Sequence, residues 1–169
     1  MMGTTQEQPY VLFDAQTPDN PARWYVVNDG VMGGVSEGKM ELDPDGHAHF
    51  SGTVRLENNG GFSSVRHRFE KRKVGAYQKV VLRLKGDGKA YQFRIKSDSR
   101  ERFSYIQHFE TTGEWETISL PFHNFYPGFR GYRLDLPNYA GEQMEEIAFL
   151  IGNKKKESFS LTIAHIHLE

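Results

Sequence analysis

The chain has 169 residues, a length typical of one globular domain, and carries 21 Lys or Arg residues against 22 Asp or Glu residues. The net charge of −1 excludes the overall positive field that drives binding to nucleic acid or to an anionic membrane, although a local basic patch is compatible with it. The absence of cysteine excludes disulfides, thiolate metal sites and thiol catalysis.

The N-terminal residues lack the features of a targeting segment. MMGTTQEQPY has neither a basic n-region nor an apolar h-region, and no apolar run approaches the roughly 18 residues of a membrane span. We therefore expect a cytoplasmic protein without membrane insertion, or an exported or organellar one if a leader has been removed. The chain is expected to form a single domain over residues 1–169, with 1–9 as a poorly ordered tail.

Alternation of apolar and polar residues predicts several short strands. The first covers residues 48–56, and two more, 80–84 and 91–95, flank the hairpin turn Gly86-Asp87-Gly88. Asp43-Pro44-Asp45-Gly46 predicts another turn, because Pro fixes φ and Gly allows a positive φ. Further strands are expected over residues 103–110, 116–120, 147–151 and 159–168.

The last of these strands changes its pattern midway. Apolar residues of one parity are followed by apolar residues of the other, in the order Phe159, Leu161, Ile163, Ile166 and Leu168. A β-bulge after Ile163, near residues 164–165, is therefore expected, because one extra residue keeps all five side chains on the core face.

Helical periodicity is almost absent from the chain. At most one turn is expected, around Gln143–Glu146. The 17 Gly and 7 Pro residues are scattered between short strands, which indicates turns rather than helical crossovers. The sequence therefore predicts an all-β fold in which two antiparallel sheets pack as a β-sandwich or jelly roll.

Histidine spacing gives the main candidate for a metal site. His47 with His49, and His165 with His167, place two imidazoles on one strand face, as cupin-type sites do. The rest of that motif is missing, so solvent-exposed histidines are the favoured interpretation. Paired carboxylates for glycoside chemistry are a less favoured alternative, because turn chemistry explains the Asp residues at strand ends. We predict no catalytic residue, no metal and no cofactor.

Two short basic runs could serve either to bind a ligand or to protect the chain against aggregation. Arg66–Lys73 and Lys154–Lys156 lie beside aromatic residues and could contact phosphates or an acidic partner. Lys and Arg at strand edges and in loops also prevent aggregation, and this is the favoured interpretation.

Two glycine-rich segments and one aromatic loop are the candidates for a binding surface. Asn28–Ser36 and Asn58–Ser64 tolerate positive φ, and are expected to form tight bends, either alone or combined with a binding surface. The loop Pro121–Gly141 carries aromatic residues and Arg, which suit a protein interface, a sugar platform or a cover for the sandwich end. The predicted binding residues are Asn28, Asp29, Met32, Asn59, Phe62, Tyr126, Arg130 and Tyr132, with Met32 and Phe62 as apolar anchors.

Four blocks of sequence, taken in order, resemble the complex I intermediate-associated protein family. They are WYVVNDGVMGGVS (24–36), FSG (50–52) with ENNGGFSSVR (57–66), GDGKAYQFR (86–94), and scattered Gly, Trp, Pro, Phe and Arg residues within 113–131. The resemblance implies a galactose-binding-like jelly roll. The chain departs from the pattern at residues 163–165, which read Ile-Ala-His where relatives often carry Ile-Asp.

The resemblance also implies a function. The mitochondrial extension and the fused nucleotide-binding domain of some members are missing, so the chain resembles a stand-alone bacterial-type member. Mitochondrial members act as assembly factors for respiratory complex I, and no catalytic residues are established for the module. A non-catalytic module that binds a protein partner, such as respiratory-complex subunits, is therefore expected. The alternative is a carbohydrate-binding module that binds a glycan. A flat platform of exposed rings favours sugar, whereas an apolar patch rimmed by charges favours protein.

Overall fold

The structure, a computed structural model, describes residues 10–17 and 24–169, without the side chains of Val31, Met32 and Asn59. The expectation of a poorly ordered tail over residues 1–9 concerns residues outside this range. Among the described residues, no helix has the length and apolar character needed to cross a membrane.

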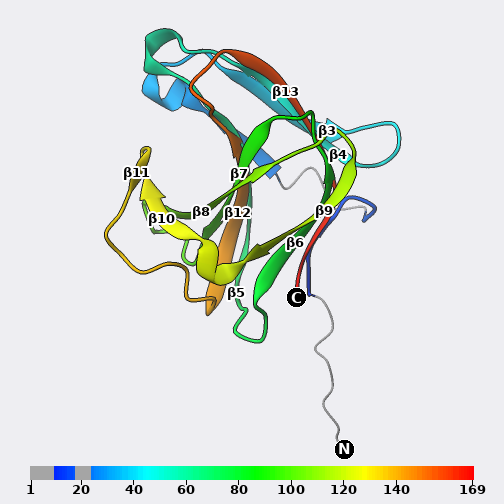
Figure 1. Cartoon of the computed structure of the whole chain (residues 1–169), viewed down its shortest axis with the longest axis vertical. Helices are drawn as coiled ribbons and strands as arrows, with labels where there is room; N and C mark the ends of the chain where they lie inside the picture. The colour runs from blue at the N-terminus through cyan, green and yellow to red at the C-terminus, as the bar shows by residue number, and fades with distance from the viewer. Residues whose placement is uncertain (1–9, 18–23) are drawn as a thin grey trace, which may run out of the picture.

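The described chain forms two antiparallel sheets that pack face to face as a β-sandwich, which confirms the predicted fold class (Figure 1). Sheet I has the strand order β3-β4-β13-β6-β9, with β1 paired to β13. Its strands are β1 (Tyr10–Asp14), β3 (Glu37–Leu42), β4 (Ala48–Val54), β6 (Lys79–Lys85), β9 (Trp115–Pro121) and β13 (Glu157–Leu168).

Sheet II, which carries the candidate site, has the strand order β11-β10-β8-β7-β12-β5-β2. Its strands are β2 (Trp24–Asn28), β5 (Ser63–Lys73), β7 (Ala90–Lys96), β8 (Ser104–Glu110), β10 (Tyr126–Phe129), β11 (Tyr132–Arg133) and β12 (Gln143–Ile151). Within the described residues, three short 3-10 helices lie in the connections: η2 (Asp29–Met32), η3 (Glu57–Asn59) and η4 (Phe122–Asn124).

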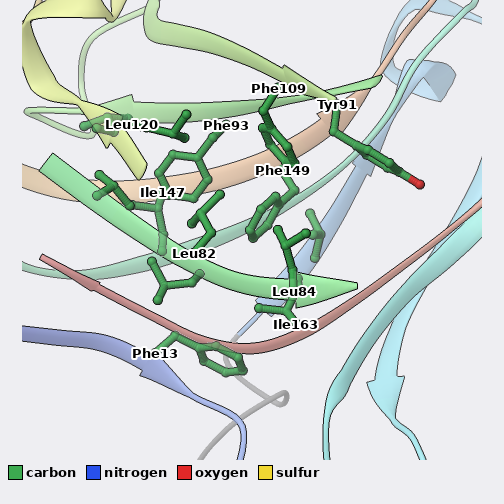
Figure 2. Close-up of a cluster of buried hydrophobic side chains, with 14 of the residues drawn as sticks. Phe13, Leu82, Leu84, Tyr91, Phe93, Phe109, Leu120, Ile147, Phe149 and Ile163 are labelled. Carbon is green, nitrogen blue, oxygen red and sulfur yellow. The ribbon is translucent and has the colours of Figure 1, made fainter. Parts of the chain in front are cut away.

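The core lies between the sheets and is rich in aromatic rings (Figure 2). Phe93 on β7 and Phe149 on β12 pack edge to face with ring centroids 5.1 Å apart. Leu82 and Leu84 on β6 meet them from sheet I, and all four side chains are fully buried. Each such side chain contributes about 1.5–3 kcal/mol through burial, so this layer fixes the two sheets against each other.

The bulge predicted in the last strand is present. The pairing of β13 with β6 shifts register between Ile163 and His165. The five apolar residues on either side of the shift are all buried: Phe159, Leu161, Ile163, Ile166 and Leu168. One extra residue therefore restores the inward face, as the change of parity indicated.

Two predicted segments differ from the structure. The helical turn expected around Gln143–Glu146 is wrong, because these residues open β12, and Met144 is fully buried in the core. The segment 121–141 is not one long loop, because β10 pairs with β8 and β11 pairs with β10. Burial of Phe122, Phe125 and Tyr139 against the core draws this segment into the sheet.

Candidate functional site

The two glycine-rich segments meet around a buried carboxylate, that of Asp29. Asp29 begins η2 and is fully buried. Its Oδ1 accepts the backbone N–H of Ser36 at 3.0 Å, and its Oδ2 accepts the Ser36 hydroxyl at 2.5 Å. The same Oδ2 accepts the backbone N–H groups of Gly61 at 2.6 Å and Phe62 at 3.3 Å. One carboxylate at the start of η2 therefore ties Ser36, which follows η2, to the segment that follows η3.

Small residues in both segments make room for this carboxylate. A Cβ on Gly34 would overlap Asp29 Cγ, and a Cβ on Gly60 would lie 2.5 Å from Asp29 Oδ2. Burial acts to raise the pKa of Asp29, but the hydrogen bonds from Ser36, Gly61 and Phe62 outweigh it and leave the pKa below its usual value. The carboxylate is therefore held ionised, and the glycines form tight bends around it.

A groove of about 900 Å³ lies beside these bends, across the outer face of sheet II. Its floor comes from five neighbouring strands, β5, β12, β7, β8 and β10. One wall contains Gly61 and Phe62, and the opposite end is the turn from β10 to β11, which stands at the left of Figure 1. No described lining residue is Asp or Glu. Six described lining residues are cationic: Arg66, Arg94, Lys96, Arg102, Arg130 and Lys154.

Strand register places two of the arginines in one row. Ala148 on β12 is paired with Arg66 on β5 and with Arg94 on β7. Only the small side chain of Ala148 separates the two guanidinium-bearing residues along that row, since paired residues on neighbouring strands point to the same face. The sheet therefore brings like charges together on the floor of the groove.

The floor cations are held in place by neutral acceptors. Arg94 donates from Nε and Nη2 to the side-chain oxygen of Gln92, at 2.9 and 2.7 Å. Lys96 is buried, and its Nζ donates to the carbonyl oxygens of Glu101 and Phe103. Burial, together with the charge of Arg66, lowers the pKa of Arg94 to about 10. Burial also lowers the pKa of Lys96.

None of the six groove cations forms an ion pair with a carboxylate among the described residues. Elsewhere on the molecule ion pairs are common, and the Lys and Arg residues that form them are Lys39, Arg68, Lys71, Lys79, Lys89, Arg100 and Lys155. Glu146, which is paired with Lys96 in the sheet, instead accepts from Tyr25 at 2.9 Å and from Arg68 at 3.3 Å. All six groove cations therefore lack an ion-pair partner among the described residues, whereas half of the other described Lys and Arg residues have one.

Removing one of these charges is expected to stabilise the fold. Arg66→Gln should raise the free energy of unfolding by about 0.5–1 kcal/mol, because the repulsion with Arg94 is lost while a polar side chain remains. The gain should shrink as salt is added. Urea denaturation at two salt concentrations measures it, with Lys73→Gln, outside the groove on the same strand, as the control. A destabilised Arg66→Gln variant would contradict the repulsion.

Some of the predicted binding residues line the groove in the structure, and others do not. Phe62 and Arg130 line the groove, and the Arg130 guanidinium lies over the Phe129 ring at 5.2 Å. Asp29 lies in the interior, so its expected place on a surface is corrected. Asn28 is half-buried and accepts the Ser63 hydroxyl at 2.5 Å. Tyr126 and Tyr132 are not among the described lining residues, and the side chains of Met32 and Asn59 lie outside the described part of the structure.

Sequence reasoning missed most of the groove floor. Gln92, Arg94 and Lys96 alternate with buried residues on β7, so the sequence predicts the polar face of that strand and nothing more specific. The two basic runs each supply one residue, Arg66 and Lys154. Alternation identifies an outward face but not which outward faces are neighbours, because that depends on the order of the strands.

The histidine pairs do not assemble a metal site. The rings of His165 and His167 lie 5.4 Å apart, and the Nε2 of His167 lies 2.7 Å from a carboxylate oxygen of Glu169. In residues 10–17 and 24–169, no group of three or more His, Cys, Asp or Glu side chains could hold a metal ion.

Similar solved structures share the fold. The family 11 carbohydrate-binding module of the cellulase Lic26A-Cel5E of Clostridium thermocellum has a TM-score of 0.71 and 17% identity, with 97% of this chain and 95% of that chain covered. An exo-β-agarase has a TM-score of 0.61 and 9% identity, with 95% of this chain but 24% of that chain covered. At such identities the likeness concerns the architecture of the sandwich.

Sequence comparisons give the family. The mitochondrial complex I intermediate-associated protein 30 of Mus musculus is 22% identical over 186 residues, which cover 95% of this chain. The alignment covers 56% of the mouse protein, so the chain spans little more than half the length of that relative. The family model for complex I intermediate-associated protein 30 (CIA30) matches residues 13–163. The chain therefore belongs to the CIA30 family.

Proposed function

We propose that this chain is a non-catalytic module that binds a protein partner in the groove of sheet II. The groove itself carries the proposal, because apolar and cationic side chains share one open surface across five strands. Its apolar residues are Leu56, Phe62, Phe129 and Leu150. Apolar contacts combined with Arg are the composition favoured at protein interfaces.

Family membership supports a role in assembly. The mouse relative is named as a protein associated with an intermediate of complex I. We propose that the partner of this chain is likewise a subunit or an assembly intermediate of respiratory complex I. The module would bind the partner before it is fully assembled.

The lining of the groove supports binding rather than catalysis. Its described residues include no His, Asp or Glu, so the side chains that most often act as general acid or base are missing from it. Ser104 supplies the one hydroxyl side chain among them. Lys96 is directed to the carbonyl oxygens of Glu101 and Phe103, which occupy its ammonium group.

The carbohydrate alternative has less support from the side chains. The described lining contains no Tyr or Trp ring on which a sugar could stack. Tyr126 lies nearby on β10, but its ring already contacts His108, with centroids 5.9 Å apart, and Arg133 at 4.9 Å. Tyr132 is 76% exposed but stands outside the groove.

Affinity capture tests the protein-binding proposal. A tagged chain incubated with detergent-solubilised respiratory membranes of its own organism should retain complex I subunits, identified by mass spectrometry. Phe62→Ser should reduce their recovery about tenfold, because it removes an apolar contact in the groove. Tyr132→Ser, at an exposed ring outside the groove, should leave recovery unchanged.

Both variants must keep the melting temperature of the parent within a few degrees. Equal recovery with folded Phe62→Ser would overturn the placement of the partner in the groove. Specific recovery of glycans or of cell-wall polymers in place of respiratory subunits would overturn the protein-binding proposal itself.

A further inference from the structure

We infer that the groove binds an extended acidic peptide segment of the partner, about six residues long, that also carries apolar side chains. The inference rests on the proposed function and specifies its ligand. Four features of the groove carry it: its unpaired charge, its excess of hydrogen-bond donors, its length and its exposed backbone.

The positive charge of the groove favours an anionic ligand. Six cationic side chains line the groove, and none forms an ion pair with a described carboxylate. Arg66 and Arg94 flank Ala148 in one cross-strand row, so their repulsion is built into the sheet. A ligand that brings several negative charges relieves this repulsion when it binds, and complementary charge also accelerates association.

The hydrogen-bonding character of the lining favours carboxylates over neutral sugars. Lys and Arg side chains only donate. The amide oxygen of Gln92 already accepts two hydrogen bonds from Arg94. Among the described lining residues, the Ser104 hydroxyl is then the side-chain acceptor that is available to a ligand. Each sugar hydroxyl needs an acceptor for its own proton, whereas an ionised carboxylate needs none. The groove therefore matches a ligand rich in acceptors.

The length of the groove suits a short stretch of extended chain. Five neighbouring strands at a spacing of roughly 4.8 Å span about 19 Å, the length of about six extended residues. Leu56 and Phe62 lie toward one end, near β5 and β12, and Phe129 lies toward the other, on β10. Apolar contacts at both ends, with Arg94 and Lys96 between them, indicate a segment in which acidic residues are flanked by apolar ones.

One glycine in the lining leaves backbone open to the ligand. Gly131, in the turn from β10 to β11, is exposed, and a Cβ there would meet nothing within 4 Å. A peptide main chain can therefore approach the backbone at Gly131 closely enough to hydrogen-bond with it. A chain of peptide groups uses such a contact, which favours a peptide over a simple polyanion.

A fluorescein-labelled octapeptide that alternates Glu with Leu and Phe is the probe for this site. Fluorescence anisotropy at about 50 mM salt should show saturable binding, and the same peptide with Gln in place of Glu should bind at least tenfold more weakly. The affinity should fall as salt rises, because the contacts are ionic. Equal binding of the Gln peptide would overturn the inference.

Variants locate the binding. Arg94→Gln should weaken the Glu peptide at least tenfold, and the pair Arg66→Gln with Arg102→Gln provides a second variant in case Arg94→Gln fails to fold. Lys39→Gln combined with Lys73→Gln removes two charges elsewhere and should change the affinity less than twofold. An equal loss in this control would show general charge attraction and overturn the assignment to the groove.

Competition separates the other ligand classes. Polygalacturonate, sodium tripolyphosphate and a mixed-linked β-glucan tetrasaccharide should each displace the peptide weakly. Tighter binding of any of them than of the Glu peptide would overturn the inference in favour of that class. If the peptide fails while capture of respiratory subunits still depends on Phe62, then the acidic-peptide assignment falls and the proposed protein-binding function stands.

Discussion

Asp29→Ala is expected to lower the free energy of unfolding by about 3–5 kcal/mol, the largest effect of any substitution considered for this chain. The change leaves the Ser36 hydroxyl and the backbone N–H groups of Ser36, Gly61 and Phe62 without their common acceptor. Asp29 is fully buried, so water replaces these bonds poorly. Urea denaturation followed by fluorescence of the two Trp residues measures the loss.

Asp45→Ala is the matched control, because Asp45 is exposed in the turn between β3 and β4 and its change should cost less than about 0.5 kcal/mol. The loss of unfolding free energy in Asp29→Asn should lie between the losses in Asp29→Ala and Asp45→Ala. The pKa of Asp29 is lowered in the folded state, so its stabilising contribution is present above the ordinary Asp pKa and is lost as the pH falls through the folded value. The difference in stability between the parent chain and the Asp29→Asn variant should therefore narrow in acid.

Gly60→Ala is expected to lower the free energy of unfolding by about 2–3 kcal/mol. The added Cβ would lie 2.5 Å from Asp29 Oδ2 and 2.9 Å from Asp29 Cγ, inside the van der Waals limit. The backbone at Gly60 has φ −73°, which any residue adopts, so the cost is one of space and not of backbone strain. Equilibrium denaturation of the variant measures it.

A double-mutant cycle isolates the cause. In the Asp29→Ala background the carboxylate is gone, and Gly60→Ala should then cost less than about 1 kcal/mol. Gly30→Ala is the control, since a Cβ there meets nothing within 4 Å. Equal costs of Gly60→Ala in both backgrounds would show that the glycine is required for a reason other than the carboxylate.

Much of the sandwich follows from local patterns in the sequence. Alternation identifies β4, β6, β7 and β13, and the change of parity in β13 locates its bulge, because burial on one face imposes a period of two. The start of β12 escapes this reasoning because Glu145 and Glu146 interrupt its apolar run. Glu146 is buried all the same, since Tyr25 and Arg68 bond its carboxylate.

The candidate site follows from the sequence only in part. Phe62 and Arg130, two of the predicted binding residues, line the groove, but Arg94 and Lys96 are predicted only as part of the polar face of a strand. The groove depends on the order of five strands, of which β5 and β12 are far apart in the chain yet adjacent in the sheet. The buried role of Asp29 is equally hidden, because its partners Gly61 and Phe62 lie over thirty positions away.

The Asp29 carboxylate helps to set the shape of the groove but not the chemical character of its lining. It fixes the wall at Gly61 and Phe62 from behind, through backbone N–H groups, and contributes no atom to the lining. The cations on the floor stand on regular strands and are held by their own side-chain contacts. Substitutions among them should therefore alter binding of the proposed ligand while the wall stays in place. The shape of this site and the specificity proposed for it depend on separate sets of residues.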